Sequence, residues 1–327
     1  RTMMLKPPAE RPAMALVAEE LRRVRAPGTS GTTPKVRVTA GQSIGNYRLL
    51  RQLGGGGMGV VFEASHDRLS RRAAVKILRP ELSSDPEMVR RFFNEAEAVN
   101  LVHHPGIVNV FEYGQLPDQT VYIVMEFLEG ESLHRRMSRE GGRLGAPGVR
   151  LLRQVASALA TAHARGVVHR DVKPENIMVI PDPEVQGGER AKILDFGIAK
   201  MAGGVHSSLA PDGPATQAGQ TLGTPIYMAP EQSRDAGRVD DRADVYSLGV
   251  ILYEMLAGRP PFWAQTVSEL LSQHLYTAPR PLREQDPSIA PELEALCARM
   301  LAKDPLTRPT MNQVADALEH APEPPAP

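Results

Sequence analysis

The sequence has few of the features that mark disulfide-stabilised, membrane-spanning or nucleic-acid-binding proteins. Its single cysteine, Cys297, excludes an intrachain disulfide and a cysteine-rich metal site, and favours a reducing, cytoplasmic location. Cys297 lies in an apolar helical pattern, which predicts a packed core thiol and not a nucleophile. Basic and acidic residues number 38 each, so no charge excess favours nucleic acid or an anionic membrane. No apolar run reaches the roughly 18–20 residues that a transmembrane helix needs.

What is present is a globular region between two ends of biased composition. The 327 residues, 42% of them hydrophobic, suffice for a core and about two domains. Residues 1–43 are rich in Pro, Ala, Arg and Thr and indicate a flexible arm or linker; a short amphipathic helix within it is the alternative. Residues 320–327 form a proline-rich tail that cannot pack as a helix or strand.

Between these ends the residue pattern changes once. Short β-like runs dominate residues 44–127, interrupted by one helix-like stretch at 86–102. Long helix-like patterns dominate 128–319, at 149–165, 243–256, 291–302 and 311–318. The sequence therefore predicts an α+β protein, with a small β-rich domain followed by a larger helical one.

A glycine run lies between two strand-like segments. Gly54, Gly56, Gly59 and Val61 satisfy the pattern G-x-G-x-x-G-x-V. Glycines let a backbone approach phosphate oxygens closely, although such runs also occur in plain hairpins. The segment after Gly59 continues as a strand, which excludes the strand-to-helix fingerprint of dinucleotide-binding proteins.

Two charged residues occupy otherwise apolar faces. Strand alternation places Lys76 on the same face as Ala74 and Leu78, where it needs either an anion or a route to solvent. Glu95 falls in an apolar stripe of the helix that begins near Pro86. Lys76 is the candidate partner of Glu95, and a solvated glutamate at the edge of the stripe is the alternative.

The densest polar cluster follows the helix-like pattern at 149–165. Asp171, Lys173 and Asn176 fall within one short loop, and Pro174 prevents this loop from being a helix interior. A carboxylate can accept a hydroxyl proton, an ammonium can neutralise phosphate, and an amide oxygen can bind a hard cation. A second apolar strand ends at Asp195, which suits a further cation contact.

The order of these motifs resembles that of the protein kinase family. Within this family the sequence is most similar in kind to the bacterial receptor-type serine/threonine kinases. The resemblance runs from about Ile44 to Leu318. It implies a bilobal fold, with an N-lobe at 44–127 and a C-lobe at 128–319. The motifs that carry it are the glycine run, the Ala-x-Lys strand, the helix glutamate, His169-Arg170-Asp171, Asp195-Phe196-Gly197 and Ala229-Pro230-Glu231.

The resemblance also implies a role for each matching residue. ATP and Mg²⁺ are the implied cofactors. The glycines would cover the ATP phosphates, Lys76 would hold the α- and β-phosphates, and Glu95 would pair with Lys76. Asp171 would accept the substrate proton and Lys173 would steady the transferring phosphoryl group. Asn176 and Asp195 would bind magnesium. The residues implied to line the nucleotide pocket are Val61, Ala74, Met125, Glu126 and Leu128.

Lys173 and the segment 223–231 are similar to those of kinases that phosphorylate serine or threonine, so the resemblance implies protein substrates with these acceptors. In this family the arginine at position 170 often pairs with a phosphate on the activation segment, for which Thr216 and Thr221 are the candidates. Autophosphorylation through a transient homodimer is implied as well. Glu231 would pair with Arg308, and Asp244 would tie the catalytic loop to a buried helix; both are interpreted as scaffold.

Two other classes of protein compete with this interpretation. A pseudokinase scaffold keeps the fold and binds nucleotide without catalysis, but it usually lacks one of the groups that are all present here. A small-molecule phosphotransferase would not be expected to carry the segment 223–231, which supports a peptide.

Overall fold

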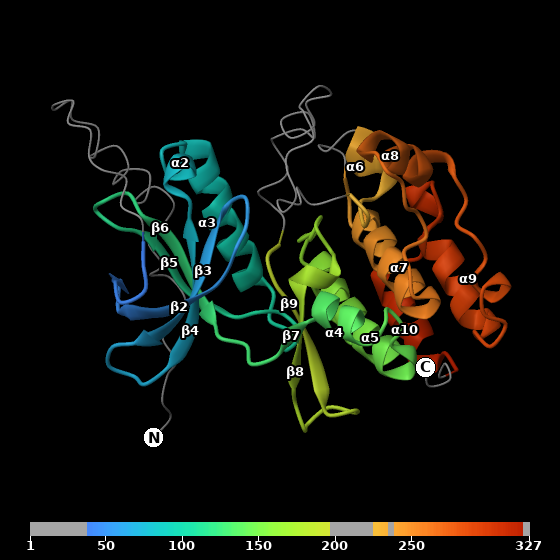
Figure 1. The fold of residues 1–327 in the computed structure, drawn as a ribbon, viewed down its shortest axis with the longest axis horizontal. Coiled ribbons are helices and arrows are strands. Elements are labelled where there is room, and N and C mark those ends of the chain that lie inside the picture. Colours follow the sequence, from blue (N-terminus) through green and yellow to red (C-terminus); the bar gives the residue numbers. More distant parts are fainter. Residues whose placement is uncertain (1–37, 197–224, 235–238, 323–327) are drawn as a thin grey trace, which may run out of the picture. The chain divides into compact units, whose positions relative to one another are not determined.

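The computed structural model describes residues 38–196, 225–234 and 239–322, which belong to one compact unit (Figure 1). Of the predicted arm (1–43) and the predicted tail (320–327), residues 1–37 and 323–327 lie outside the described residues. Ser43 begins β1, and His320 is the last residue of α10. The domain boundaries proposed above stay predictions.

The β-rich lobe is built on an antiparallel sheet. Its strands are β1 (Ser43–Ile44), β2 (Tyr47–Gly55), β3 (Gly59–His66), β4 (Arg72–Leu78), β5 (Val110–Gln115) and β6 (Val121–Glu126). They lie in the order β1-β2-β3-β4-β6-β5. In this register Ala74 pairs with Met125 and Lys76 with Ile123, so β4 and β6 bring the predicted pocket residues side by side.

Helix α3 (Pro86–Leu101) packs beside this sheet after the short helix α2 (Pro80–Ser83) (Figure 1). It begins where the sequence predicts, with Pro86 in the first turn and the Asp85 side chain accepting a hydrogen bond from the Glu87 N–H at 2.9 Å. Phe92, Glu95 and Val99 are buried along one stripe. The stripe therefore carries Glu95 toward the sheet.

The helical lobe contains α4 (Leu133–Arg139), α5 (Gly145–His163), α6 (Pro230–Arg234), α7 (Arg242–Ala257), α8 (Val267–Tyr276), α9 (Pro291–Met300) and α10 (Met311–His320). A small sheet of β7 (Glu131–Ser132), β8 (Ile177–Pro181) and β9 (Glu189–Ile193) lies beside it. Strands β8 and β9 form an antiparallel hairpin in which Ile177 pairs with Ile193 and Pro181 with Glu189. The α+β fold class is confirmed, and none of the described helices is long and apolar enough to cross a membrane.

Helix α7 is the buried centre of the helical lobe. Nearly all of its side chains are inaccessible, and it ends at Gly258, whose φ of 81° suits glycine. Cys297 of α9 is buried against it, and its thiol donates to the Gly249 carbonyl at 3.6 Å. Burial raises the pKa of this thiol, so the predicted core thiol is confirmed.

Candidate active site

Three charged groups meet where β4, α3 and the end of β9 converge. The Lys76 ammonium lies 2.8 Å from Glu95 Oε1 and 2.9 Å from Asp195 Oδ1. The Lys76 and Glu95 side chains are only 10% and 8% exposed, whereas that of Asp195 is 42% exposed. The predicted pairing of Lys76 with Glu95 is confirmed, and the solvated alternative for Glu95 is wrong.

Burial sets the electrostatics of this cluster. Burial alone would lower the pKa of Lys76, but the carboxylates of Asp195 and Glu95 outweigh it and raise that pKa, so the amine stays charged. Burial raises the pKa of Glu95, and Lys76 offsets only part of the rise. The cluster thus presents a fixed cation beside the more exposed carboxylate of Asp195.

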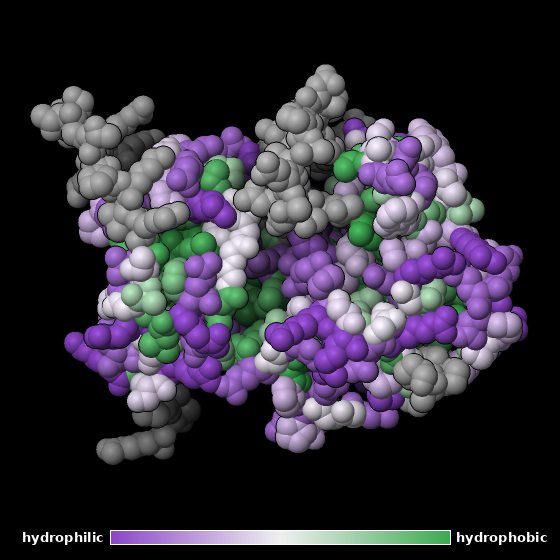
Figure 2. All heavy atoms as spheres, in the orientation of Figure 1, coloured by the Kyte–Doolittle hydropathy of each residue, from purple (hydrophilic) through white to green (hydrophobic). Residues whose placement is uncertain are grey.

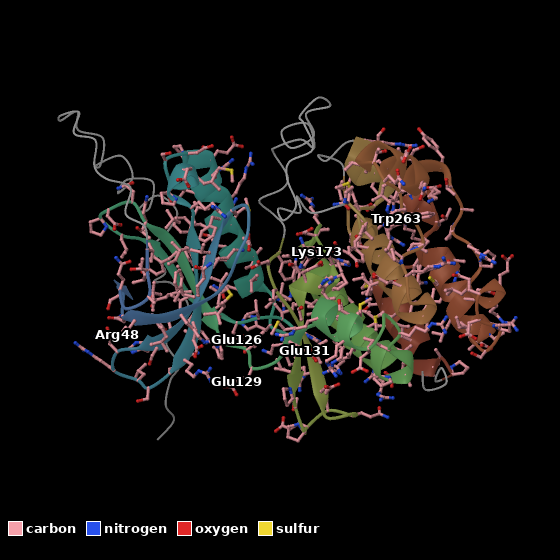
Figure 3. The ribbon with its side chains drawn as sticks, in the orientation of Figure 1. Arg48, Glu126, Glu129, Glu131, Lys173 and Trp263 are labelled. Atoms are coloured by element: carbon pink, nitrogen blue, oxygen red, sulfur yellow. The ribbon has the colours of Figure 1, made fainter. Side chains whose placement is uncertain are left out.

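A second cluster lies in the loop between α5 and β8. Lys173 Nζ is 3.0 Å from Asp171 Oδ2. The Asn176 amide donates to the Asp171 carbonyl at 2.9 Å and to its carboxylate at 3.2 Å. Lys173 lies on the side of the helical lobe that faces the sheet (Figure 3). The structure therefore holds all three predicted loop residues together.

His169 joins this loop to the segment that carries Asp195. Its ring is fully buried, packs against Phe196 at a centroid distance of 4.7 Å, and its Nε2 lies 2.8 Å from the Leu194 carbonyl. Its Nδ1 accepts from the Asp171 N–H at 3.2 Å. One buried imidazole thus positions Asp171 and the chain entering Asp195.

Asp244 of α7 anchors the same loop from beneath. Its carboxylate accepts the backbone N–H groups of His169 and Arg170 at 2.8 and 2.7 Å. Burial would raise the pKa of Asp244, but the His163 imidazole, at 2.8 Å, helps to keep it below its usual value. Arg170 has a φ of 65°, which is strained for a side chain of this kind. Asp244 therefore stabilises the turn that places Asp171, as predicted.

Glu231 and Arg308 form the predicted ion pair. Arg308 Nη1 and Nη2 lie 2.6 and 2.9 Å from the two Glu231 oxygens, and Arg308 is 2% exposed. The Arg308 guanidinium also donates to backbone carbonyls at Ala302 and Arg242. Such a buried two-pronged pair fixes α6 on the helical lobe and suits a scaffold role.

The glycine run forms the turn between β2 and β3. A Cβ built at Gly54 or Gly56 would meet no atom within 4 Å, so this side of the loop is open. A Cβ at Gly59 would lie 2.3 Å from the Ile77 carbonyl oxygen. Gly59 is thus required by the close approach of β4, a reason distinct from phosphate contact.

A hollow separates the sheet from the helical lobe, with hydrophobic residues at its floor (Figure 2). Met125 is 8% exposed. It is one of the residues that line a small pocket, which are Glu95, Ala96, Val99, Val108, Val110, Ile123, Met125 and Asp195.

Several predicted residues lie outside the described part of the chain. They include Gly197, Thr224 and both phosphorylation candidates, Thr216 and Thr221.

The comparisons with known proteins agree with this geometry. A family model described as the protein kinase domain matches residues 47–320. The chain belongs to the protein kinase family. The predicted resemblance is thereby confirmed.

Relatives of this kinase domain are bacterial proteins named as serine/threonine-protein kinases. It is 41% identical to pkn3 and 44% identical to Pkn1 of Myxococcus xanthus, over 85% and 82% of this chain. It is 40% identical to PknA of Mycobacterium tuberculosis over 84% of this chain. The matches span 50%, 37% and 60% of those proteins, so the chain covers less than two thirds of the length of each of these relatives.

Solved kinase structures share its fold. The crystal structure of the Mycobacterium tuberculosis PknI kinase domain superimposes with a TM-score of 0.65 at 28% identity. The match covers 86% of this chain and 98% of that one.

The kinase site also contains contacts that the sequence analysis missed. Glu126, at the end of β6 where the chain passes from one lobe to the other (the hinge, residues 126–128), is tied to both lobes. Its Oε1 accepts from the Asn109 backbone at 2.7 Å and from Lys192 of β9. Glu126 and Lys173 both lie between the lobes (Figure 3). Lys192 is 8% exposed in β9, a strand that also carries Glu189 and Arg190, so the local sequence gives no signal that marks Lys192 as the buried partner of Glu126.

The residues present fit the cofactors that the kinase family implies. The Asp195 carboxylate and the Asn176 amide oxygen are the hard oxygen ligands that Mg²⁺ prefers. The open side of Gly54 and Gly56 leaves space for phosphate oxygens.

Proposed function

We propose that this chain is an ATP- and magnesium-dependent protein kinase that phosphorylates serine or threonine. The observation that carries the proposal is the buried Lys76 ammonium held at once by Glu95 and Asp195. A cation fixed in this way, beside a partly exposed carboxylate, suits the binding and positioning of a nucleotide phosphate chain. The bacterial relatives named as serine/threonine kinases support the choice of acceptor.

The nucleotide occupies the hollow between the lobes in this proposal. The backbone at Gly54, Gly56 and Gly59 covers the phosphates, and Lys76 holds the α- and β-phosphates. The adenine ring lies against apolar side chains and the backbone of the hinge. The residues assigned to this pocket are Val61, Ala74, Met125, Glu126 and Leu128.

Asp171 and Lys173 act at the reacting atoms. Asp171 orients the acceptor hydroxyl and takes its proton as the oxygen bonds to the γ-phosphorus and ADP departs. Lys173, 3.0 Å from Asp171, neutralises charge on the phosphoryl group during transfer. His169 and Asp244 hold the loop in this geometry.

Asn176 and Asp195 would hold the magnesium ions. When bound, Mg²⁺ neutralises phosphate charge and orients the phosphate chain. Asp195 is already oriented by Lys76, and Asn176 by Asp171. Loss of either oxygen ligand is therefore expected to impair transfer more than any change at the surface.

Activation through phosphorylation of Thr216 or Thr221 is part of the proposal. Among the described residues, the Arg170 guanidinium donates one hydrogen bond, from Nη2 to the Val239 carbonyl at 3.0 Å, and its Nε and Nη1 are buried. A buried guanidinium with remaining donors suits a phosphate partner. Phosphorylation between two copies in a transient dimer is the route we propose.

The biological setting is also a proposal. This chain spans only part of the length of its relatives, so we assign to it the kinase reaction alone and not the activity of a whole relative. We assign protein substrates bearing serine or threonine, no role in nucleic-acid binding, and a cytoplasmic site of action.

The test is phosphate transfer from labelled ATP with magnesium, to the chain itself and to a generic protein such as myelin basic protein. Asp171→Asn is the matched control, because it keeps the shape of the side chain and removes the base. Label in the wild type alone, mapped by mass spectrometry to Thr216 or Thr221, is the expected result. ATP binding without transfer in either protein would favour the pseudokinase alternative.

A further inference from the structure

Arg79, the residue that follows β4, contacts the glycine loop through both its backbone and its side chain. Its N–H donates to the Met58 carbonyl at 2.9 Å, and its Nε donates to the Gly56 carbonyl at 2.9 Å. The Gly56 N–H closes the turn by donating to the Gly59 carbonyl at 2.8 Å. Arg79 is thus bonded to two residues of the loop tip.

The loop itself supplies little else to order its tip. None of the glycines from Gly54 to Gly57 has a positive φ, so the backbone conformation does not require glycine there. A Cβ at Gly54, Gly56 or Gly57 would contact nothing within 4 Å, so these residues have no close packing against their Cβ positions. Because glycine loses more conformational freedom than any other residue on ordering, a run of four is costly to hold in one shape.

We propose that Arg79 is a positioning residue that orders the glycine loop for binding the phosphates of the nucleotide. The inference rests on the proposed function, since it assigns the loop to ATP. Arg79 acts through its hydrogen bond to the Gly56 carbonyl, which fixes the N–H groups of the loop tip before the nucleotide arrives. Because the loop is already ordered, the free-energy cost of ordering it does not reduce the affinity for the nucleotide phosphates.

The test compares the affinities of the purified chain for Mg-ATP and for adenosine by titration calorimetry. Arg79→Ala is expected to lower the affinity for Mg-ATP about fivefold, which is the effect of losing one hydrogen bond. The affinity for adenosine should not change. Arg79→Gln keeps a donor without the charge and should retain most of the ATP affinity. The control is Arg48→Ala, because Arg48 is an exposed arginine of β2 at the outer edge of the same lobe (Figure 3).

A second variant tests the ordering itself. Gly57→Ala stiffens the loop where a Cβ meets no atom, so in the Arg79→Ala background it should recover part of the lost ATP affinity. Wild-type ATP affinity in Arg79→Ala would overturn the proposal. So would equal losses in the Gln and Ala variants, which would point to charge, or an equal loss for adenosine, which would point to a general defect of the lobe.

These binding measurements do not depend on catalysis. A wild type that binds ATP but transfers no phosphate would reject the proposed function, while the affinities of the Arg79 variants would still decide this proposal.

Discussion

At the scale of single residues, the site holds a charged pair, Lys76 and Glu95, whose burial reduces its contribution to the stability of the fold. Lys76 and Glu95 are both almost inaccessible, and burial raises the pKa of Glu95 despite its partner. A buried ion pair of this kind contributes little net stability, because desolvation offsets the attraction. Its presence is better explained by the need to hold Lys76 in place.

We therefore expect Glu95→Gln to separate activity from stability. Transfer, measured as kcat/KM for ATP, should fall about tenfold to a hundredfold, or about 1.4 to 3 kcal/mol in transition-state stabilisation. At neutral pH the free energy of unfolding should change little, because Asp195 still pairs with Lys76 at 2.9 Å and the neutral amide removes the cost of burying the Glu95 charge. Urea denaturation beside the kinetic assay checks both quantities.

Glu97→Gln is the matched control, since Glu97 is exposed on the same helix and accepts a hydrogen bond from Tyr113. Equal kinetic losses in the two variants would contradict the assigned role of Glu95.

Asp244, unlike Glu95, is expected to contribute substantially to the free energy of unfolding. Its carboxylate accepts two consecutive backbone N–H groups at the strained residue Arg170, and it is fully buried. Asp244→Ala leaves those donors unsatisfied and should cost about 3 kcal/mol of unfolding free energy. Asp241→Ala, three residues earlier and partly exposed, serves as the control. A loss below that of the control in urea denaturation would show that the loop does not need this anchor.

At the scale of secondary structure, long periodic segments were predictable and contacts between them were not. The helix at 86–102 and the strand around Lys76 were located from apolar periodicity, and the structure gives α3 and β4 there. The sequence analysis does not predict helices α2, α4, α6 and α8. In α8 only Leu270 and His274 are buried, which leaves too weak an apolar stripe to recognise.

The same limit applies to the candidate site. Each of its motifs is local in sequence, so Asp171, Lys173 and Asn176 were identified before their geometry was known. The contact from Lys192 to Glu126 joins β9 to the hinge across 66 positions. No local pattern carries such a pairing, because it depends on how the two lobes are folded together.

The crossing of α7 and α9 provides a prediction at this scale. A Cβ at Gly249 would lie 2.8 Å from the Met300 Cβ and 3.3 Å from Leu301, so the two helices approach at this glycine. Alanine would gain about 1 kcal/mol in helix propensity, but overpacking costs about 1 to 3 kcal/mol in a dense core. We expect Gly249→Ala to lower the melting temperature in calorimetry. A higher melting temperature would mean that α7 and α9 can move apart to accommodate the added methyl group without loss of stability.

At the scale of the whole molecule, the stability of the chain in mild acid depends on buried groups with opposite effects. His274 is 1% exposed, beside Tyr246 and Lys303, and burial lowers its pKa to about 4. The unfolded chain therefore binds a proton at His274 more readily than the folded one, and stability is lost as the pH falls from about 6.5 toward 4. Glu95, whose pKa is raised, binds its proton more readily when folded, so its contribution grows as the pH falls.

The pH-dependent contributions of His274 and Glu95 to stability partly cancel in the wild type. The variants His274→Gln and Glu95→Gln should separate them. Between about pH 6.5 and 4.5, His274→Gln should become more stable relative to the wild type as the pH falls, approaching a slope of about 1.4 kcal/mol per pH unit. Glu95→Gln should show the opposite trend over the same range, because it keeps the loss at His274 and removes the gain at Glu95. Urea denaturation at a series of pH values measures both differences, with exposed His320→Gln as the control. If the curves of His274→Gln and the wild type run parallel, His274 must take up its proton equally in both states, and acid sensitivity must arise elsewhere in the fold.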